Sequence, residues 1–219
     1  MNTRLLTEIE SKELLRKAGI PVIEARLART AKESIGLSRQ IGFPVVMKIA
    51  SPDIVHKSDV GGVKLGLANA AQASRAYREI ISAVRQKIPQ ARIEGMSIQK
   101  MARPGVELII GMSQDPQFGP VLMFGLGGVL VEIIKDVSFR LVPVTPRDAG
   151  QMIKEIKGFP LLEGYRGSEP VDIGKLQELI VKISGFIENN PQIQELDLNP
   201  VYGYRDSVIA VDARIVIED

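Results

Sequence analysis

Three polar residues near the C-terminal end of the sequence have the types and spacing of a divalent-cation site. In the segment Glu195-Leu-Asp-Leu-Asn-Pro200, Glu195, Asp197 and Asn199 alternate with leucines, so on a strand their side chains share one face. Asp212 follows 13 positions after Asn199, at the end of a second predicted strand. Carboxylate and amide oxygens bind magnesium together with water and phosphate oxygens. We predict that Asp197, Asn199 and Asp212 hold magnesium; the alternative is an amphipathic strand with a solvated polar face.

Lys48 is the second candidate, because it lies within the apolar segment Val45 to Ala50. Its neighbours on both faces of the predicted strand are apolar, so its ammonium group is expected to be partly desolvated. A buried charge requires an anionic partner or a shifted pKa. A phosphate would serve as the partner. A salt bridge to a carboxylate elsewhere, or a side chain that reaches the rim of the sheet, is the alternative.

The loop of residues 51–62 contains His56, the only histidine in the sequence, and ends in Gly61-Gly62. Glycines allow backbone amides to approach a phosphate closely, although hairpins also use Gly-Gly turns. An imidazole can act as an acid or base, bind a metal or accept a phosphoryl group. A lone histidine in a chain without cysteine does not indicate zinc. A solvated surface histidine is the alternative.

Other candidates lie in the middle of the sequence. The segment ending in Arg103-Pro-Gly105 reads as a strand and a turn whose backbone could meet an adenine edge, and Glu107 could meet ribose or metal. Arg140 and Arg166 lie in short motifs beside strand ends or glycine, and their guanidinium groups suit phosphate. An exposed ion pair is the alternative for both arginines.

The elements that position these residues follow from capping and periodicity. Thr7, Thr30 and Asn69 predict helix starts, with the third helix reaching about Lys87. Strands are predicted at about 22–28, 45–50 and 63–68. After Arg92, short apolar segments separated by glycine and proline predict a mostly antiparallel sheet. These segments are 93–101, 106–113, 121–124, 129–134 and 138–144. Helices are predicted at about 146–156 and 173–189, and final strands at 194–198 and 208–212. We predict an α+β protein with two lobes, at residues 1–102 and 103–219, and a cleft between them.

The composition limits the class of protein. The chain has 219 residues, a formal net charge of +2 and no cysteine. It therefore has neither disulfides nor thiolate metal sites, and its charge does not indicate a general nucleic-acid or membrane-surface binder. No apolar stretch reaches the length of about 20 residues that a membrane-spanning helix needs. We predict a cytoplasmic protein.

The order of these motifs resembles the ATP-grasp family and, more closely, the nucleotide-binding β subunit of ADP-forming acetyl-CoA (acyl-CoA) synthetases. The resemblance covers essentially the whole chain. It is carried by five fragments whose ordered coincidence is specific: Phe-Pro-Val-Val-Met-Lys48, His56-Lys-Ser-Asp-Val-Gly-Gly-Val, Pro104-Gly-Val-Glu-Leu-Ile-Ile-Gly111, Gly125-Leu-Gly-Gly-Val and Leu196-Asp-Leu-Asn-Pro200.

The resemblance implies a role for each candidate. Lys48 matches the lysine that contacts nucleotide phosphates, and His56 matches the loop histidine proposed in that branch as a second phosphohistidine. Glu107 matches the glutamate on the first strand of the second lobe. The remaining matches are Gly61 and Gly62 of the mobile phosphate-covering loop, Gln99, Lys100 and Met101 of the adenine segment, and Asp197, Asn199 and Asp212 of the magnesium site. His56 and Arg140 are the candidate catalytic residues.

The resemblance also implies a reaction and a partner. Acyl-CoA, ADP and phosphate would give a carboxylic acid, ATP and CoA, with ATP/ADP and Mg²⁺ bound by this chain. A CoA-binding α subunit would carry the primary phosphohistidine, in an α2β2 assembly without nucleic acid or membrane. Starting at Met1 with the family N-terminus, the chain is expected to be a separate subunit. Two alternatives remain: a non-catalytic ATP-binding regulatory subunit, and a stand-alone ATP-grasp carboxylate–amine ligase.

Overall fold

The computed structural model describes residues 3–54, 56–128 and 135–218. The chain forms two compact units. We call Leu6–Lys12 with Ile23–Arg103 the N-terminal unit, and Met1–Leu5, Glu13–Val22 and Pro104–Asp219 together the C-terminal unit.

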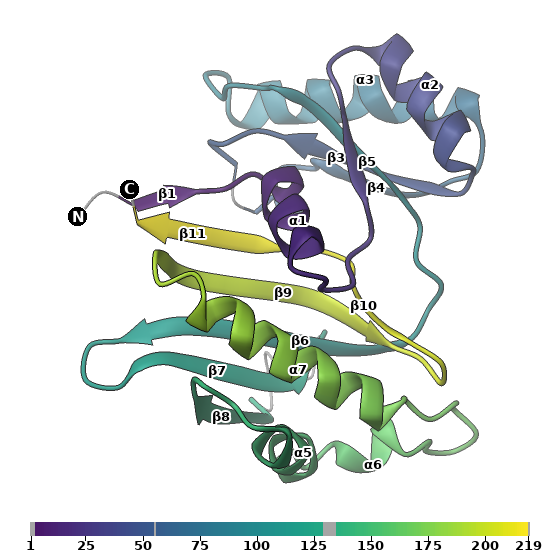
Figure 1. The fold of residues 1–219 in the computed structure, drawn as a ribbon. Coiled ribbons are helices and arrows are strands. Elements are labelled where there is room, and N and C mark those ends of the chain that lie inside the picture. Colours follow the sequence, from purple (N-terminus) through teal and green to yellow (C-terminus); the bar gives the residue numbers. More distant parts are fainter. Residues whose placement is uncertain (1–2, 55, 129–134, 219) are drawn as a thin grey trace. The chain divides into compact units, whose positions relative to one another are not determined.

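The N-terminal unit is a four-stranded antiparallel sheet with two helices. Its strands are β2 (Ala25–Ala28), β3 (Val45–Ala50), β4 (Val63–Leu67) and β5 (Gly95–Lys100), in the order β2-β5-β3-β4. The helices α2 (Ala31–Ile41) and α3 (Ala70–Lys87) pack on each other and on this sheet (Figure 1). Helix α1 (Glu8–Lys17) contributes its first residues to this unit.

Local capping explains where these helices begin. The side chain of Thr30 accepts a hydrogen bond from the backbone N of Glu33, and that of Asn69 accepts one from Gln72 N. At α1, Thr7 N donates to Glu10 Oε2 at 2.7 Å, and Glu10 N donates to Thr7 Oγ1 at 3.3 Å. Each bond satisfies a donor that the first helical turn leaves open. The three predicted helix starts are therefore confirmed.

The two faces of β3 have different surroundings. Val45, Met47 and Ile49 belong to the apolar core that the sheet forms with α2 and α3. Lys48 points the opposite way, because successive side chains on a strand alternate. It is nevertheless buried.

The C-terminal unit contains a larger antiparallel sheet of seven strands. The path β1-β11-β9-β6-β7-β8 runs across it, and β10 pairs with β9. The bounds are β1 (Thr3–Leu5), β6 (Val106–Asp115), β7 (Gly119–Leu126), β8 (Val137–Leu141), β9 (Ile193–Gly203), β10 (Val208–Ala210) and β11 (Arg214–Glu218).

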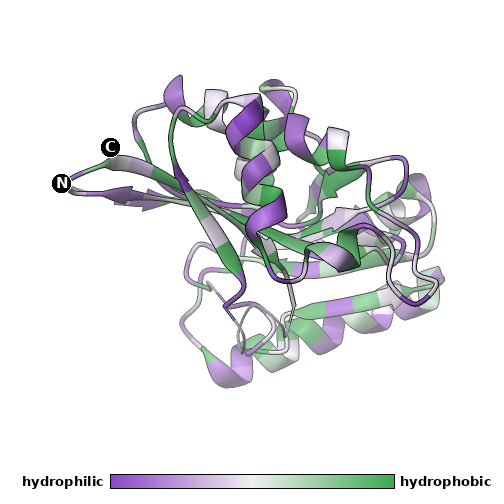
Figure 2. Ribbon diagram, turned by 90° about the horizontal axis from the view of Figure 1, so that it is seen from below, coloured by the Kyte–Doolittle hydropathy of each residue, from purple (hydrophilic) through white to green (hydrophobic). Residues whose placement is uncertain are grey.

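Helices cover one face of this sheet (Figure 1). They are α5 (Pro146–Glu155), the short α6 (Phe159–Leu162) and α7 (Ile173–Glu188). The fully buried Leu108, Ile110, Leu122 and Phe124 come from β6 and β7, and Met152 comes from α5. Figure 2 shows hydrophilic and hydrophobic residues interspersed along the helices, as expected of helices that bury only one face.

The α+β class predicted from the sequence is confirmed. Three short elements were not predicted: β1, β11 and α6. The expected lobe 1–102 differs from the N-terminal unit, because Thr3–Leu5 pairs with β11 and residues 13–22 also belong to the C-terminal unit. The predicted strand at 129–134 lies outside the described residues. No described helix has both the length and the apolar character needed to cross a membrane.

Candidate functional site

Lys48 is held by the carboxylate of Glu8, which was not among the candidates in the sequence. Its Nζ donates to Glu8 Oε1 at 2.8 Å. Lys12 Nζ donates to the same oxygen at 2.8 Å, and Lys57 Nζ donates to Glu8 Oε2 at 2.9 Å. Lys12 Nζ also donates to Gln99 Oε1 at 2.6 Å. We call these five residues the Glu8 cluster; all of them belong to the N-terminal unit.

The Glu8 cluster is shielded from water. The side chains of Glu8 and Lys12 are each 3% exposed, and that of Lys48 is 7% exposed. Burial alone would raise the pKa of Glu8, but the charges of Lys48, Lys12 and Lys57 outweigh it and hold that pKa well below its usual range. Glu8 is therefore ionised at neutral pH, and the salt-bridge alternative for Lys48 applies in this conformation.

The loop 51–62 runs from β3 to β4 and is packed at both ends. His56 is exposed, and its neighbour Lys57 joins the Glu8 cluster. Gly61 has φ +71°, a left-handed conformation that favours glycine. Gly62 N donates to Lys57 O, and Ile49 N donates to Gly62 O, both at 2.7 Å. The loop thus places His56 one residue away from a lysine that shares its carboxylate with Lys48.

The predicted adenine segment lies at the end of β5. The Gln99 side chain is fully buried and accepts a hydrogen bond from Lys12. Lys100 Nζ donates to the carbonyl oxygens of Gly42 and Phe43 at 2.7 and 2.8 Å, so it binds the C-terminal end of α2. Met101 N donates to Pro44 O at 3.1 Å. Adenine recognition by these residues stays a prediction.

In the C-terminal unit, the predicted magnesium residues come from β9 and from the turn between β10 and β11. Asp197 on β9 pairs with Gly111 on one side and with Arg214 on the other. The turn that carries Asp212 lies against the end of β9, because Val211 N donates to Pro200 O at 2.9 Å. Paired strands thus bring the turn with Asp212 to the Asp197-Leu-Asn199 segment.

The electrostatics of Asp197 suit a cation. Burial raises the pKa of Asp197; the charge of Arg214 opposes this, and those of Asp212 and Glu195 add to it. A divalent cation would relieve the repulsion between the carboxylates. The described residues contain no group of three or more His, Cys, Asp or Glu side chains that could hold a metal. The predicted set has two carboxylates and one amide, which suits magnesium that keeps water or phosphate oxygens as further ligands.

Glu107 lies at the start of β6, on the same face of the sheet as Gly111 and Asp197. Tyr202 Oη donates to Glu107 Oε1 at 3.3 Å. Gly128 has φ +66°, and a Cβ added there would lie 2.6 Å from Glu107 Oε2. The glycine turn that follows β7 therefore packs directly against the Glu107 carboxylate, which gives the Gly-Leu-Gly-Gly motif a structural reason.

The two arginines are placed differently from the magnesium residues. Arg140 Nη1 donates to Glu155 Oε2 on α5 at 2.9 Å. Arg140 pairs with the buried Leu122 across the strands, so it lies on the helix-covered face of the sheet, opposite to Asp197. Arg166 lies over the Tyr165 ring with Cζ 5.4 Å from its centroid. The structure does not bring Arg140 to the magnesium residues.

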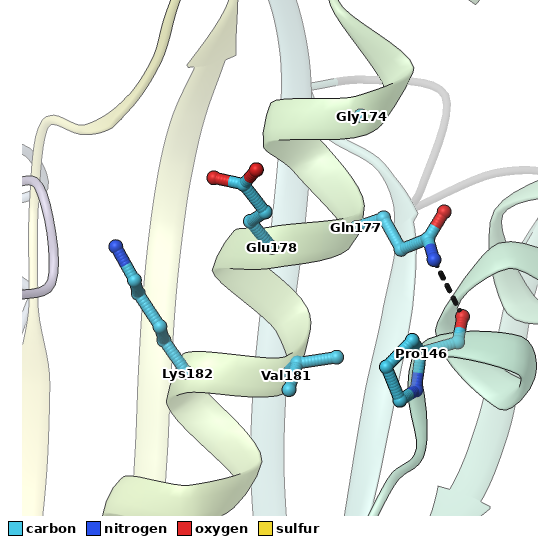
Figure 3. A pocket seen from close by; sticks show the side chains of 6 residues that line it. All are labelled: Pro146, Gly174, Gln177, Glu178, Val181 and Lys182. Atoms are coloured by element: carbon cyan, nitrogen blue, oxygen red, sulfur yellow. Dashed lines mark hydrogen bonds between the residues drawn. The ribbon is translucent and has the colours of Figure 1, made fainter.

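A surface pocket of about 420 Å³ lies between the start of α5 and one side of α7. Figure 3 shows its lining, in which Gln177 donates a hydrogen bond to the Pro146 carbonyl oxygen at 2.7 Å. None of its lining residues was a candidate in the sequence: Pro146, Gly174, Gln177, Glu178, Val181 and Lys182. Neither Lys48 nor Asp197 lines this pocket.

The comparisons with known proteins agree with the resemblance seen in the sequence. A family model described as an ATP-grasp domain matches residues 1–217. The β subunit of an ADP-forming acetate–CoA ligase I from Pyrococcus furiosus is 50% identical over 214 residues, covering 98% of this chain and 92% of that protein. The ADP-forming acetate–CoA ligase I of Archaeoglobus fulgidus is 46% identical over 208 residues, covering 95% of this chain but 30% of that longer protein.

Two solved structures of the dinucleotide-forming acetyl-coenzyme A synthetase 1 of Ca. Korarchaeum cryptofilum are also similar. One contains coenzyme A and Ca-AMPCP; it has a TM-score of 0.96 and 51% identity, over 98% of this chain and 94% of that chain. The other contains coenzyme A and Mg-AMPPCP, with its phosphohistidine segment pointing towards the nucleotide binding site. It has a TM-score of 0.86 and 47% identity, over 98% and 93% of the two chains. The predicted ATP-grasp fold is confirmed.

Proposed function

Because the chain belongs to the ATP-grasp family and is closely related to β subunits of ADP-forming acetate–CoA ligases, we propose that it is the nucleotide-binding subunit of an ADP-forming acyl-CoA synthetase. The reaction converts acyl-CoA, ADP and phosphate into a carboxylic acid, ATP and CoA. The observation that carries this proposal is similarity over nearly the full length of both chains. It argues against a carboxylate–amine ligase, which would need a further substrate lobe.

The N-terminal unit would supply the phosphate contacts. Lys48 would bind the nucleotide phosphates, and the turn Gly61-Gly62 would cover them with its backbone amides. Gln99, Lys100 and Met101 would border the adenine. The ammonium group of Lys48 is already held in place by Glu8, so little side-chain freedom is lost when phosphate binds.

The C-terminal unit would supply the metal contacts. Asp197, Asn199 and Asp212 would hold Mg²⁺, and Glu107 would contact the ribose or the metal. When bound, Mg²⁺ would offset the charge of the nucleotide phosphates. The raised pKa of Asp197, caused by burial and by neighbouring carboxylates, supports this assignment, because a cation there would lower the repulsion.

His56 would relay the phosphoryl group. In the ATP-forming direction, a phosphoryl group on a ring nitrogen of His56 passes to the terminal phosphate oxygen of ADP. The nitrogen–phosphorus bond breaks as the new oxygen–phosphorus bond forms, and the ring nitrogen recovers its lone pair. In the reverse direction, His56 receives the group from ATP and returns it to the partner subunit.

The partner would be a CoA-binding α subunit that carries the primary phosphohistidine, in an α2β2 assembly in the cytoplasm. Two comparisons support a partner. One similar protein is named as a β subunit, and another protein extends far beyond the region that matches this chain. Acyl specificity would then lie largely in the partner.

The test is incubation of the purified chain with Mg²⁺ and γ-labelled ATP, followed by acid and base treatment of the labelled protein. We expect acid-labile, base-stable label in the wild-type chain and none in His56→Ala, with ADP binding retained in both. Nucleotide binding without turnover, even with the α subunit present, would instead favour the regulatory subunit. A chain that binds neither ADP nor ATP would overturn the proposal.

A further inference from the structure

Glu8 is the common acceptor for lysines that come from three separate segments of the N-terminal unit. Lys12 lies one helical turn further along α1, Lys48 lies on β3 and Lys57 lies in the loop 51–62. Glu8 and Lys48 are 40 positions apart in the sequence, and Glu8 and Lys57 are 49 apart. One carboxylate therefore joins the first turn of α1, strand β3 and the loop that carries His56.

The two oxygens of this carboxylate have different partners. Oε1 accepts from Lys48 and Lys12, and Oε2 accepts from Lys57 at 2.9 Å. Because both oxygens belong to one rigid group, the ammonium groups of Lys48 and Lys57 are kept close together. Lys12 extends the contact to Gln99 on β5. Glu8 therefore connects the loop to β3 and, through Lys12, to β5.

Burial distinguishes this cluster from an ordinary surface ion pair. The side chain of Glu8 is 3% exposed and that of Lys57 is 19% exposed. In the same helix, the pair Glu13–Lys17 has side chains that are 52% and 68% exposed. Exposed pairs contribute little, whereas removing one member of a buried pair leaves uncompensated charge. Buried ion clusters are poor devices for stability alone, which points to a role in positioning.

We propose that Glu8 is a positioning residue whose carboxylate docks the His56 loop onto β3 through Lys57 and holds Lys48 beside it. This inference rests on the proposed function for the roles of Lys48 and His56. The docking itself stands on the contacts of the N-terminal unit. Lys57 is the next residue after His56, so the position of the Lys57 side chain governs where the imidazole can reach.

Hydrogen–deuterium exchange of the whole chain tests the docking directly. The amide of Gly62 donates to Lys57 O at 2.7 Å, and that of Gly61 donates to Ser58 O at 3.0 Å. Glu8→Gln removes the shared negative charge. Lys57→Met removes only the contact between the loop and Glu8, which keeps its hydrogen bonds to Lys12 and Lys48. We expect the Gly61 and Gly62 amides to exchange at least about tenfold faster in both variants, since a charge-assisted bond is lost.

The controls separate docking from a general loss of structure. Glu13→Gln removes the exposed pair in the same helix and should leave the loop amides unchanged. Glu8→Asp keeps the charge and should restore part of the protection. If Glu8→Gln does not fold, Lys57→Met alone still decides the question. Unchanged exchange at Gly61 and Gly62 in Lys57→Met would overturn the proposal.

A second readout distinguishes this proposal from the proposed function. Labelling of His56 by γ-labelled ATP should fall at least about tenfold in Glu8→Gln and Lys57→Met, and Glu8→Asp should recover part of it. If the wild-type chain binds no ADP, the proposed function fails while the exchange result still tests the docking. If the wild-type chain is labelled and both variants are labelled equally fast, the positioning role of Glu8 fails while the proposed function stands.

Discussion

Replacement of Gly62 by alanine tests how tightly the loop must pack against β3. A Cβ at this position would lie 2.6 Å from Ile49 Cγ2 and 2.8 Å from Lys57 O. Both distances are far below ordinary van der Waals contact. Gly62 is also bonded to the strand, because its carbonyl oxygen accepts from Ile49 N at 2.7 Å. The methyl group therefore cannot be accommodated unless the loop or the strand moves.

The magnitude follows from these contacts. Overpacking of this kind lowers the free energy of unfolding by about 1–3 kcal/mol. Gly61→Ala should lower it by about 1 kcal/mol, because φ there is +71°. Gly36→Ala is the matched control: a Cβ added at Gly36 in α2 would meet nothing within 4 Å. It should raise the free energy of unfolding by about 0.5–1 kcal/mol, because alanine favours the helix.

Urea unfolding followed by circular dichroism measures the stabilities, and calorimetric titration with ADP measures binding. We expect the free energy of unfolding to decrease in the order Gly36→Ala, wild type, Gly61→Ala and Gly62→Ala. ADP should bind more weakly to Gly61→Ala and Gly62→Ala than to the wild type. If Gly62→Ala had the same free energy of unfolding and the same ADP affinity as the wild type, the packing argument would be refuted. Reduced stability with unchanged ADP affinity would show that the loop does not cover the phosphates.

Three further substitutions address the remaining candidates. Lys48→Met should weaken ADP binding by roughly 10- to 150-fold in a calorimetric titration, since one charge-assisted bond contributes about 1.5–3 kcal/mol; unchanged affinity would exclude a phosphate contact. Burial and neighbouring carboxylates raise the pKa of Asp197 in the folded chain, so the folded state favours the protonated carboxyl group. This contribution to the free energy of unfolding is lost as the pH rises through the folded-state pKa. Asp197→Asn should therefore stabilise the metal-free chain at neutral pH, less so in acid, and weaken Mg²⁺-dependent ADP binding; destabilisation at neutral pH would contradict this. Arg140→Ala should change stability by less than about 1 kcal/mol and leave ADP binding intact; a large loss in a turnover assay with the α subunit would support its predicted catalytic role.

Features set by local chemistry were predictable from the sequence. The helix starts after Thr30 and Asn69 depend on residues three positions apart. The strand that carries Asp197 was indicated by the alternation of polar residues with leucines from Glu195 to Asn199. Such signals involve neighbours along the chain or a regular register, so pattern alone was sufficient.

Features set by distant contacts were not predictable in the same way. Glu8 binds Lys48 from 40 positions away, and a spacing of four residues between Glu8 and Lys12 indicates by itself only a pair on one helix face. Arg140 was selected for its residue type, but the position of Glu155 on α5 decides which face of the sheet holds it. Strand β1 has three residues and gains its structure from β11 at the other end of the chain.

The pairing of β1 with β11 has a consequence for how this domain can be connected to others. Thr3 lies opposite Glu218, so the first and last described residues are neighbours on one sheet edge (Figure 1). A domain fused to either end would leave from the same place. A short peptide joining the two ends should likewise permit a circular permutant opened at an exposed turn, such as the one at Phe118 between β6 and β7. The order of domains along a fused chain could thus change without moving the point of attachment.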